Sequence, residues 1–315
     1  MLGWLTRQLI SVVISLMVFH VPKERYQSEL DSLPDIAGRI SGANLYGWTL
    51  NEAPSARTGL KHYHFSYPAA DSAAPVMVCL HGFNTDGRAF VHLSPLADTY
   101  RLIAYNFPEK TELYSGSMDD FVGVLDDFFA QIGIDTVALL GNSVGGAVAI
   151  HYAASQPSVH VTRLVLLSTN VFGASPEDTK EIQGMADRLL GYPDYKLYYL
   201  LTKGKALVAR FRKTEIGQTA PAEIIAVKHV AWYRQVLQAL YDYDGTPYAR
   251  RVTCPVLAMH GADDRLIPIE RARVIEDLIP HATFEAVDSA GHTLVYLEAD
   301  RVIARIRETA AANVP

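Results

Sequence analysis

The amino-acid sequence predicts an α/β fold organised around a mostly parallel, doubly wound sheet. Continuous apolar runs such as residues 136–140 are typical of strands that are buried on both faces. Between about residue 75 and residue 167 these runs alternate with helical patterns, and this alternation builds a doubly wound parallel sheet. Ligands of such sheets bind beyond the carboxyl ends of the strands. We therefore look for functional residues directly after each predicted strand.

Size, composition and charge narrow the class of protein. The chain has 315 residues, which is enough for a large core in one domain with an insertion or for two small domains. Its hydrophobic fraction of 49% and charged fraction of 20% are typical of an ordered globular protein. A net charge of −6 gives no electrostatic basis for binding nucleic acid. The two cysteines, Cys79 and Cys254, have no metal or disulfide spacing, so we expect buried thiols and no metal or cofactor.

The N-terminus differs in composition from the rest of the chain. Residues 9–21 are apolar apart from two serines and one histidine. This stretch is shorter than the ~20 residues of a full membrane span, and it reaches that length only by including Arg7 and Gln8. We expect an anchor helix over residues 1–22 that associates the protein with a membrane, on a side that the flanking charges leave open. A cleaved signal peptide and a helix packed on protein are the alternatives, although no small-x-small cleavage site follows.

The remaining elements follow in order along the chain. Residues 23–42 are polar and contain Pro34 and Gly38, so they predict a linker or a short surface helix. Residues 43–67 alternate loosely and predict two antiparallel strands at the edge of the sheet. The main elements are then predicted as strand 75–80, helix 88–98, strand 101–105, helix 118–132, strand 136–140, helix 144–155 and strand 163–167.

From about residue 170 to residue 248 the alternation stops. This stretch is helical in pattern and rich in tyrosine, and its position between two strands predicts a helical lid over the strand ends. The sheet resumes with strand 255–260, helix 269–279, strand 282–287 and a last helix over 293–309. The core built around the sheet is thus expected to comprise residues 43–169 and 249–315.

The strand at residues 136–140 ends in the motif Gly141-Asn142-Ser143-Val144-Gly145-Gly146. Glycines without a Cβ atom allow the strand and the following helix to approach closely around a strained turn. Ser143 is then at the tip of the turn, and the Val144 amide is at a helix N-terminus. This geometry suits a serine nucleophile whose neighbouring amide stabilises an oxyanion.

A serine nucleophile requires a base, and the base requires a partner that fixes its tautomer. His292 follows a predicted strand end and a Gly291 turn, and Asp264 follows another strand end in the pattern Gly-x-x-Asp-x-x-x-Pro. Asp263 is a rival for the acid, because a strand-end loop can present either neighbour. The order serine, acid, histidine along the chain is that of a nucleophile-elbow hydrolase.

From about residue 43 to its end the sequence resembles the α/β-hydrolase family. The matching features are His81-Gly82, the Ser143 turn, the inserted segment, Asp264 in its motif and Gly291-His292. The resemblance implies an α/β-hydrolase fold with an inserted helical lid. It assigns Ser143 as the nucleophile, His292 as the general base and then acid, and Asp264 as the residue that orients His292.

The same resemblance implies an oxyanion hole made of the backbone amides of Phe83 and Val144. Asn84 departs from the small residue that many relatives carry, and its side chain is a candidate for an extra polar contact in the pocket. We expect structural roles for the remaining central histidines, His81, His151 and His260.

The serine nucleophile restricts the reaction. It disfavours epoxide hydrolysis and dehalogenation, for which the family has a carboxylate at the turn. An aromatic lid beside a membrane anchor favours an ester with an acyl chain, in a layout that resembles membrane-anchored monoacylglycerol lipase-like hydrolases. We therefore expect an esterase or lipase whose partner is a small-molecule or lipid ester. Carbon–carbon bond hydrolysis and cofactor-free perhydrolysis use the same triad and are alternatives, as is a non-catalytic binding protein of this fold.

Overall fold

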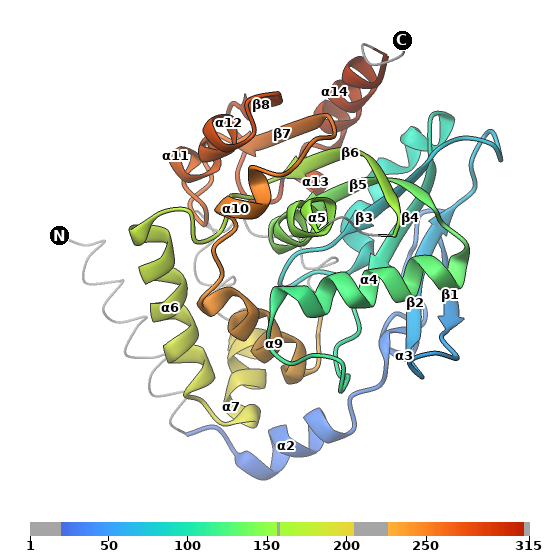
Figure 1. The fold of residues 1–315 in the computed structure, drawn as a ribbon. Helices are drawn as coiled ribbons and strands as arrows, with labels where there is room; N and C mark the ends of the chain where they lie inside the picture. Colours follow the sequence, from blue (N-terminus) through green and yellow to red (C-terminus); the bar gives the residue numbers. More distant parts are fainter. Residues whose placement is uncertain (1–19, 156–157, 205–225, 312–315) are drawn as a thin grey trace.

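The fold is built on one eight-stranded sheet, seen in a computed structural model that describes residues 20–155, 158–204 and 226–311 (Figure 1). The strand order is β1-β2-β4-β3-β5-β6-β7-β8. β2 pairs antiparallel with β1 and with β4, and the other neighbours are parallel. The predicted α/β class and the antiparallel edge are confirmed. The strands are β1 (Thr49–Pro54), β2 (Lys61–Tyr67), β3 (Val76–Leu80), β4 (Arg101–Asn106), β5 (Thr136–Asn142), β6 (His160–Leu167), β7 (Val256–Gly261) and β8 (Ala282–Val287).

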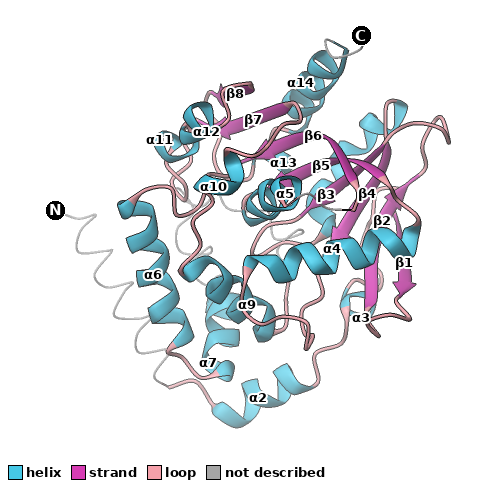
Figure 2. Cartoon of the chain, in the orientation of Figure 1, coloured by secondary structure: helices cyan, strands magenta, loops and turns pink. Residues whose placement is uncertain are grey.

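Helices cover both faces of this sheet (Figure 2). Alternate residues of β3 point to opposite faces, so Val78 and Leu80 belong to one hydrophobic cluster and Met77 and Cys79 to the other. The first cluster includes residues of α4 (Met118–Ile132), α5 (Val144–Ala154) and α12 (Val274–Leu278). The second includes residues of η1 (Gly87–Asp98), α13 (Leu294–Leu297) and α14 (Ala299–Ala311). The short helix α11 (Ile269–Ala272) precedes α12.

Local sequence signals explain the bounds of α4, which coincide with the predicted helix 118–132. Asp120 Oδ2 accepts a hydrogen bond of 2.9 Å from the Ser117 amide, which satisfies a free donor at the start of the helix. Gly133 ends the helix in the left-handed conformation, with φ 68°. Three other predicted helices differ in detail. Residues 87–98 form a 3₁₀-helix that contains Pro95. The predicted helix 269–279 is divided into α11 and α12, and the predicted helix 293–309 into α13 and α14.

The described parts of the segment between β6 and β7 are mainly helical, as its sequence pattern predicts. Its described elements are α6 (Pro176–Leu190), α7 (Asp194–Tyr199), the π-helical turn η2 (Leu200–Gly204), α9 (Val230–Tyr241) and α10 (Thr246–Ala249). We call residues 170–248 the inserted segment. Helices α6, α7 and α9 lie together to one side of the sheet (Figure 1). Residues 205–225 of this segment are outside the described part, so a lid function remains a prediction.

Residues 23–42 form short helices rather than an extended linker. They contain α2 (Lys23–Asp31) and α3 (Ile36–Arg39). Tyr26 and Leu30, four residues apart on α2, are buried, and the Tyr26 ring lies 4.9 Å from that of Tyr199. The predicted anchor over residues 1–22 lies almost wholly outside the described residues. Among the helices that are described, none has the length and apolar character of a membrane span.

Candidate active site

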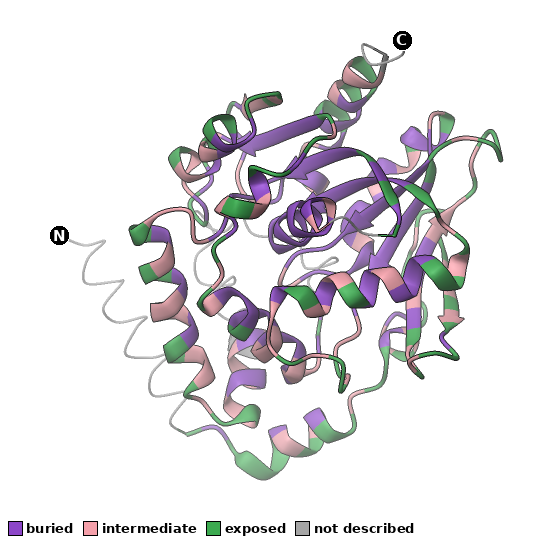
Figure 3. Cartoon of the chain, viewed as in Figure 1, coloured by how far each residue is buried: buried purple, intermediate pink, exposed green. Residues whose placement is uncertain are grey.

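Ser143 occupies a strained turn between β5 and α5. β5 ends at Asn142 and α5 begins at Val144, which leaves Ser143 with φ 54° and ψ −119°. A non-glycine residue with positive φ is held there only by surrounding structure. One such restraint is Gly145, where a Cβ atom would lie 2.1 Å from the Leu80 carbonyl oxygen. All of β5 after its first residue and nearly all of α5 are buried, so the turn is rigidly supported (Figure 3).

His292 connects Ser143 to Asp264. Its Nδ1 atom lies 2.7 Å from Asp264 Oδ2, and its Nε2 atom lies 3.2 Å from Ser143 Oγ. Because an ionised carboxylate only accepts hydrogen bonds, Nδ1 carries a proton, and in the neutral ring Nε2 then presents a lone pair toward Ser143 Oγ. That lone pair can accept the hydroxyl proton of Ser143. The three predicted side chains are therefore brought together, from loops that follow three different strands.

Asp264, and not Asp263, is the acid beside His292. Its Oδ1 atom accepts hydrogen bonds from the amides of Leu266 at 2.8 Å and Ile267 at 3.0 Å. Burial opposes ionisation of Asp264, but hydrogen bonds from His260 and His292 outweigh it and hold the pKa well below its usual value. Asp263 is exposed to solvent. Asp264 is therefore a buried carboxylate suited to orient an imidazole.

The loop after β3 lies against Ser143. A Cβ atom built on Gly82 would lie 3.4 Å from Ser143 Cβ. In the described part of the chain, neither the Phe83 amide nor the Val144 amide donates to an acceptor. These two backbone donors, without an acceptor among the described residues, flank the turn from the loop after β3 and from the start of α5. The Phe83 ring packs against Tyr233 of the inserted segment, with ring centres 5.1 Å apart.

Three contacts around the site were not foreseen from the sequence. Trp232 Nε1 donates to the Phe83 carbonyl at 2.8 Å, Lys228 Nζ lies 3.4 Å from His81 Nε2, and His260 Nε2 lies 3.1 Å from Asp264 Oδ2. The position of His260, four residues before Asp264, is a sequence signal that could have predicted its contact with that carboxylate. Lys228 had none, because a lysine in a helical insertion is normally exposed.

The other sequence-predicted polar residues lie outside the triad. The His151 ring contacts Asp119 at 2.7 Å and the Tyr243 hydroxyl at 3.2 Å. The backbone carbonyl of Asn84 accepts from the Ala226 amide at 2.9 Å. Over the described ranges, no group of histidine, cysteine and acidic side chains is arranged to hold a metal ion.

Fold and site together define an α/β hydrolase. Residues 77–305 match the model of the alpha/beta hydrolase family, and this range is most of the chain. The chain therefore belongs to the α/β-hydrolase family.

Individual relatives are distant. The chain is 24% identical over 257 residues to a Klebsiella pneumoniae protein that bears the name carbamate hydrolase RutD, covering 79% of this chain and 96% of that protein. It is 25% identical over 283 residues to the Dechloromonas aromatica protein named 2-hydroxy-6-oxononadienedioate/2-hydroxy-6-oxononatrienedioate hydrolase 1, covering 80% and 94%. The crystal structure of an enol-lactonase from Burkholderia xenovorans superposes with a TM-score of 0.66 at 17% identity, covering 83% of this chain and all of the other. The last likeness concerns the fold alone.

Proposed function

We propose that this protein is a serine hydrolase that cleaves carboxylic esters through an acyl-enzyme intermediate. The observation that carries the proposal is the position of His292, whose two ring nitrogens contact Ser143 Oγ and Asp264 Oδ2 at 3.2 Å and 2.7 Å. A serine hydroxyl is a weak nucleophile until an adjacent base accepts its proton. A base oriented by a buried carboxylate meets that need.

The proposed reaction has two halves. In the first, Ser143 Oγ attacks the ester carbonyl while His292 Nε2 accepts the hydroxyl proton. The amides of Phe83 and Val144 stabilise the oxyanion of the tetrahedral intermediate, and His292 then donates the proton to the leaving alcohol. In the second, water attacks the acyl-enzyme with His292 again as the base. Throughout, Asp264 keeps the imidazole in the required tautomer.

We further propose an apolar acyl chain on the substrate, such as that of a monoacylglycerol. The aromatic residues of the inserted segment support this choice, because Tyr233 packs on Phe83 beside the proposed oxyanion hole. Carbon–carbon bond hydrolysis is a second candidate, since the Dechloromonas relative bears the name of such a hydrolase. An assay with a dienoate product of aromatic ring cleavage distinguishes carbon–carbon bond hydrolysis from ester hydrolysis. Loss of the visible absorbance of this substrate would indicate carbon–carbon bond hydrolysis.

The test of the main proposal is a panel of p-nitrophenyl esters of increasing chain length, assayed beside a monoacylglycerol. We expect turnover by the wild type and a loss of at least about 10³-fold in Ser143→Ala. Labelling with a fluorophosphonate followed by peptide mapping should find the adduct on Ser143. Full esterase activity in Ser143→Ala would overturn the proposal.

Membrane association is proposed separately, from the apolar sequence of residues 9–21. Deleting residues 1–19 leaves Val21, which is buried, in place. We expect the full-length protein in the membrane fraction and the shortened protein in the supernatant with its activity on soluble esters retained. Full-length protein that stays in the supernatant, intact by mass, would refute the anchor.

A further inference from the structure

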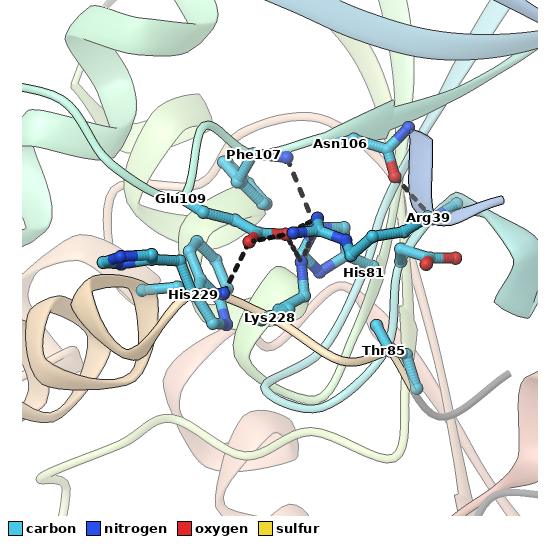
Figure 4. Close-up of polar contacts among 12 residues, drawn as sticks. Arg39, His81, Thr85, Asn106, Phe107, Glu109, Lys228 and His229 are labelled. Atoms are coloured by element: carbon cyan, nitrogen blue, oxygen red, sulfur yellow. Dashed lines mark hydrogen bonds and ion pairs between the residues drawn. The ribbon is translucent and has the colours of Figure 1, made fainter. Parts of the chain in front are cut away.

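Lys228 is a fully buried lysine next to the proposed oxyanion hole. Its ammonium lies 3.4 Å from His81 Nε2 and 3.6 Å from Glu109 Oε1 (Figure 4). It also lies 4.8 Å from the centre of the Trp232 ring. Burial lowers the pKa of Lys228, while the charge of Glu109 opposes that shift. Because removing a charge from water is costly, a cation in this position requires a compensating partner.

Glu109 provides that compensation and is itself held in place. Arg39 donates to both of its carboxylate oxygens, at 2.5 Å and 3.0 Å, and the His229 amide donates to Oε2 at 2.7 Å. A bidentate arginine fixes the plane of a carboxylate. Glu109 is thus a rigid anion that locates the Lys228 ammonium beside the His81 ring.

Contacts at both ring nitrogens define the protonation state of His81. Its Nδ1 atom lies 2.8 Å from the Gly82 carbonyl oxygen, which only accepts hydrogen bonds, so Nδ1 carries a proton. Its Nε2 atom accepts from the Phe107 amide at 3.2 Å and faces the Lys228 ammonium. Burial and the charge of Lys228 lower the pKa of His81, so the ring is neutral at pH 7. Lys228 and the Phe107 amide therefore both favour the tautomer that can hold the Gly82 carbonyl.

The Gly82 carbonyl shares a peptide plane with the Phe83 amide. In a trans peptide the C=O and N–H bonds point in opposite directions, and the described chain contains no cis peptide. Holding the carbonyl on His81 therefore directs the Phe83 N–H away from His81. The backbone carbonyl of Phe83 is restrained as well, because Trp232 Nε1 donates a hydrogen bond to it at 2.8 Å.

We propose that Lys228 is a positioning residue for the oxyanion hole, acting through His81 and the Gly82 carbonyl on the Phe83 amide. The inference rests on the ester hydrolysis proposed above. It also gives the inserted segment a role in catalysis, since Lys228 and Trp232 both belong to that segment and both hold the loop after β3.

The kinetic test compares Lys228→Met with Lys228→Gln on p-nitrophenyl acetate, with active sites counted by fluorophosphonate titration. Methionine fills similar volume without a donor, and Glu109 keeps Arg39 as its partner. We expect kcat per active site to fall about 10- to 100-fold with KM changed less than about threefold. Glutamine retains a neutral donor and should recover part of the loss. Lys61→Met, at an exposed lysine, is the matched control.

Two further readouts separate positioning from a structural role. Inhibition by a trifluoromethyl ketone, which forms a tetrahedral adduct, should weaken in proportion to kcat/KM. The ¹⁵N spectrum of the His81 ring, assigned with His81→Asn, should show an unprotonated Nε2 in the wild type and a changed signal in Lys228→Met.

Wild-type kcat and an unchanged His81 signal in Lys228→Met would overturn the positioning role, whereas a wild type that hydrolyses no ester would overturn the proposed function. If Lys228→Met does not fold, the same measurements are made on Lys228→Gln. A Lys228→Gln variant with the kcat, the inhibition and the His81 signal of the wild type would overturn the positioning role.

Discussion

Asp264 Oδ2 lies 2.7 Å from His292 Nδ1, although the two residues belong to loops that follow different strands. β7 and β8 are parallel neighbours, so their carboxyl ends place these loops side by side. The two loops pack closely at Gly261, where a Cβ atom would lie 2.4 Å from the Ala290 carbonyl oxygen. The distance between acid and base is thus fixed by the packing of the strand ends.

This relationship predicts different effects for two adjacent acids. Asp264→Asn should lower kcat by about 10⁴-fold, because an amide can hold the imidazole in the wrong tautomer. Asp263→Asn changes an exposed side chain and should alter kcat by less than about threefold. Steady-state kinetics on one soluble ester measures both. The reverse ranking would mean that Asp263 orients His292 in solution.

A second prediction concerns the glycines of two helices. A methyl group at Gly145 would meet the Leu80 carbonyl, which is backbone and cannot rotate away, so Gly145→Ala should cost about 3 kcal/mol of unfolding free energy. Gly123, on the exposed face of α4, has open space around its Cβ position. Gly123→Ala should therefore add about 0.5 to 1 kcal/mol. Urea unfolding of both variants tests this contrast, and equal changes in their unfolding free energies would contradict it.

Much of this architecture was predictable from sequence because the signals are local. The apolar runs of the buried strands mark the parallel sheet, and the bounds of α4 follow from Asp120 and Gly133. Ser143, Asp264 and His292 were identifiable because each follows a strand end in a short motif with glycine. Parallel strands bring such positions to one edge whatever their separation along the chain.

Other features depend on contacts that no local pattern records. Residues 23–42 have the polar composition of a linker, yet Tyr26 of α2 is buried beside Tyr199 of the inserted segment. Lys228 has no motif, and its burial depends on Glu109, a residue 119 positions earlier that Arg39 also binds. The choice between Asp263 and Asp264 likewise required the tertiary packing of β7 and β8.

A third prediction concerns stability at mildly acidic pH. Burial is the main cause that lowers the pKa of His64 to about 4, and the charge of His62 adds to it. In the unfolded chain this histidine titrates near its ordinary value, so between those two values the unfolded state binds more protons. Unfolding free energy should therefore fall by about 2 kcal/mol from pH 7.5 to pH 5, as an order of magnitude.

Its measurement is urea unfolding at several pH values. His64→Leu should flatten this part of the profile, although the pKa of His62 is also lowered by burial and leaves some dependence. His160→Leu, at an exposed histidine, should keep the wild-type slope. An unchanged slope in His64→Leu would show that His64 is not the source of the acid sensitivity.

The last prediction concerns His260, which shares Asp264 with His292. Its Nε2 atom lies 2.8 Å from the Ile267 carbonyl and 3.1 Å from Asp264 Oδ2. Both partners are acceptors, so Nε2 carries the proton and donates to both.

His260→Leu removes this donor and should lower kcat about tenfold, since one hydrogen bond to a charged group is worth about 1.5 kcal/mol or more. His260→Gln places an amide donor at a similar reach and should stay within about threefold of the wild type. The readout is kcat per titrated active site, with urea unfolding run in parallel, and equal kcat values in the two variants would contradict a role for the His260 proton in holding Asp264.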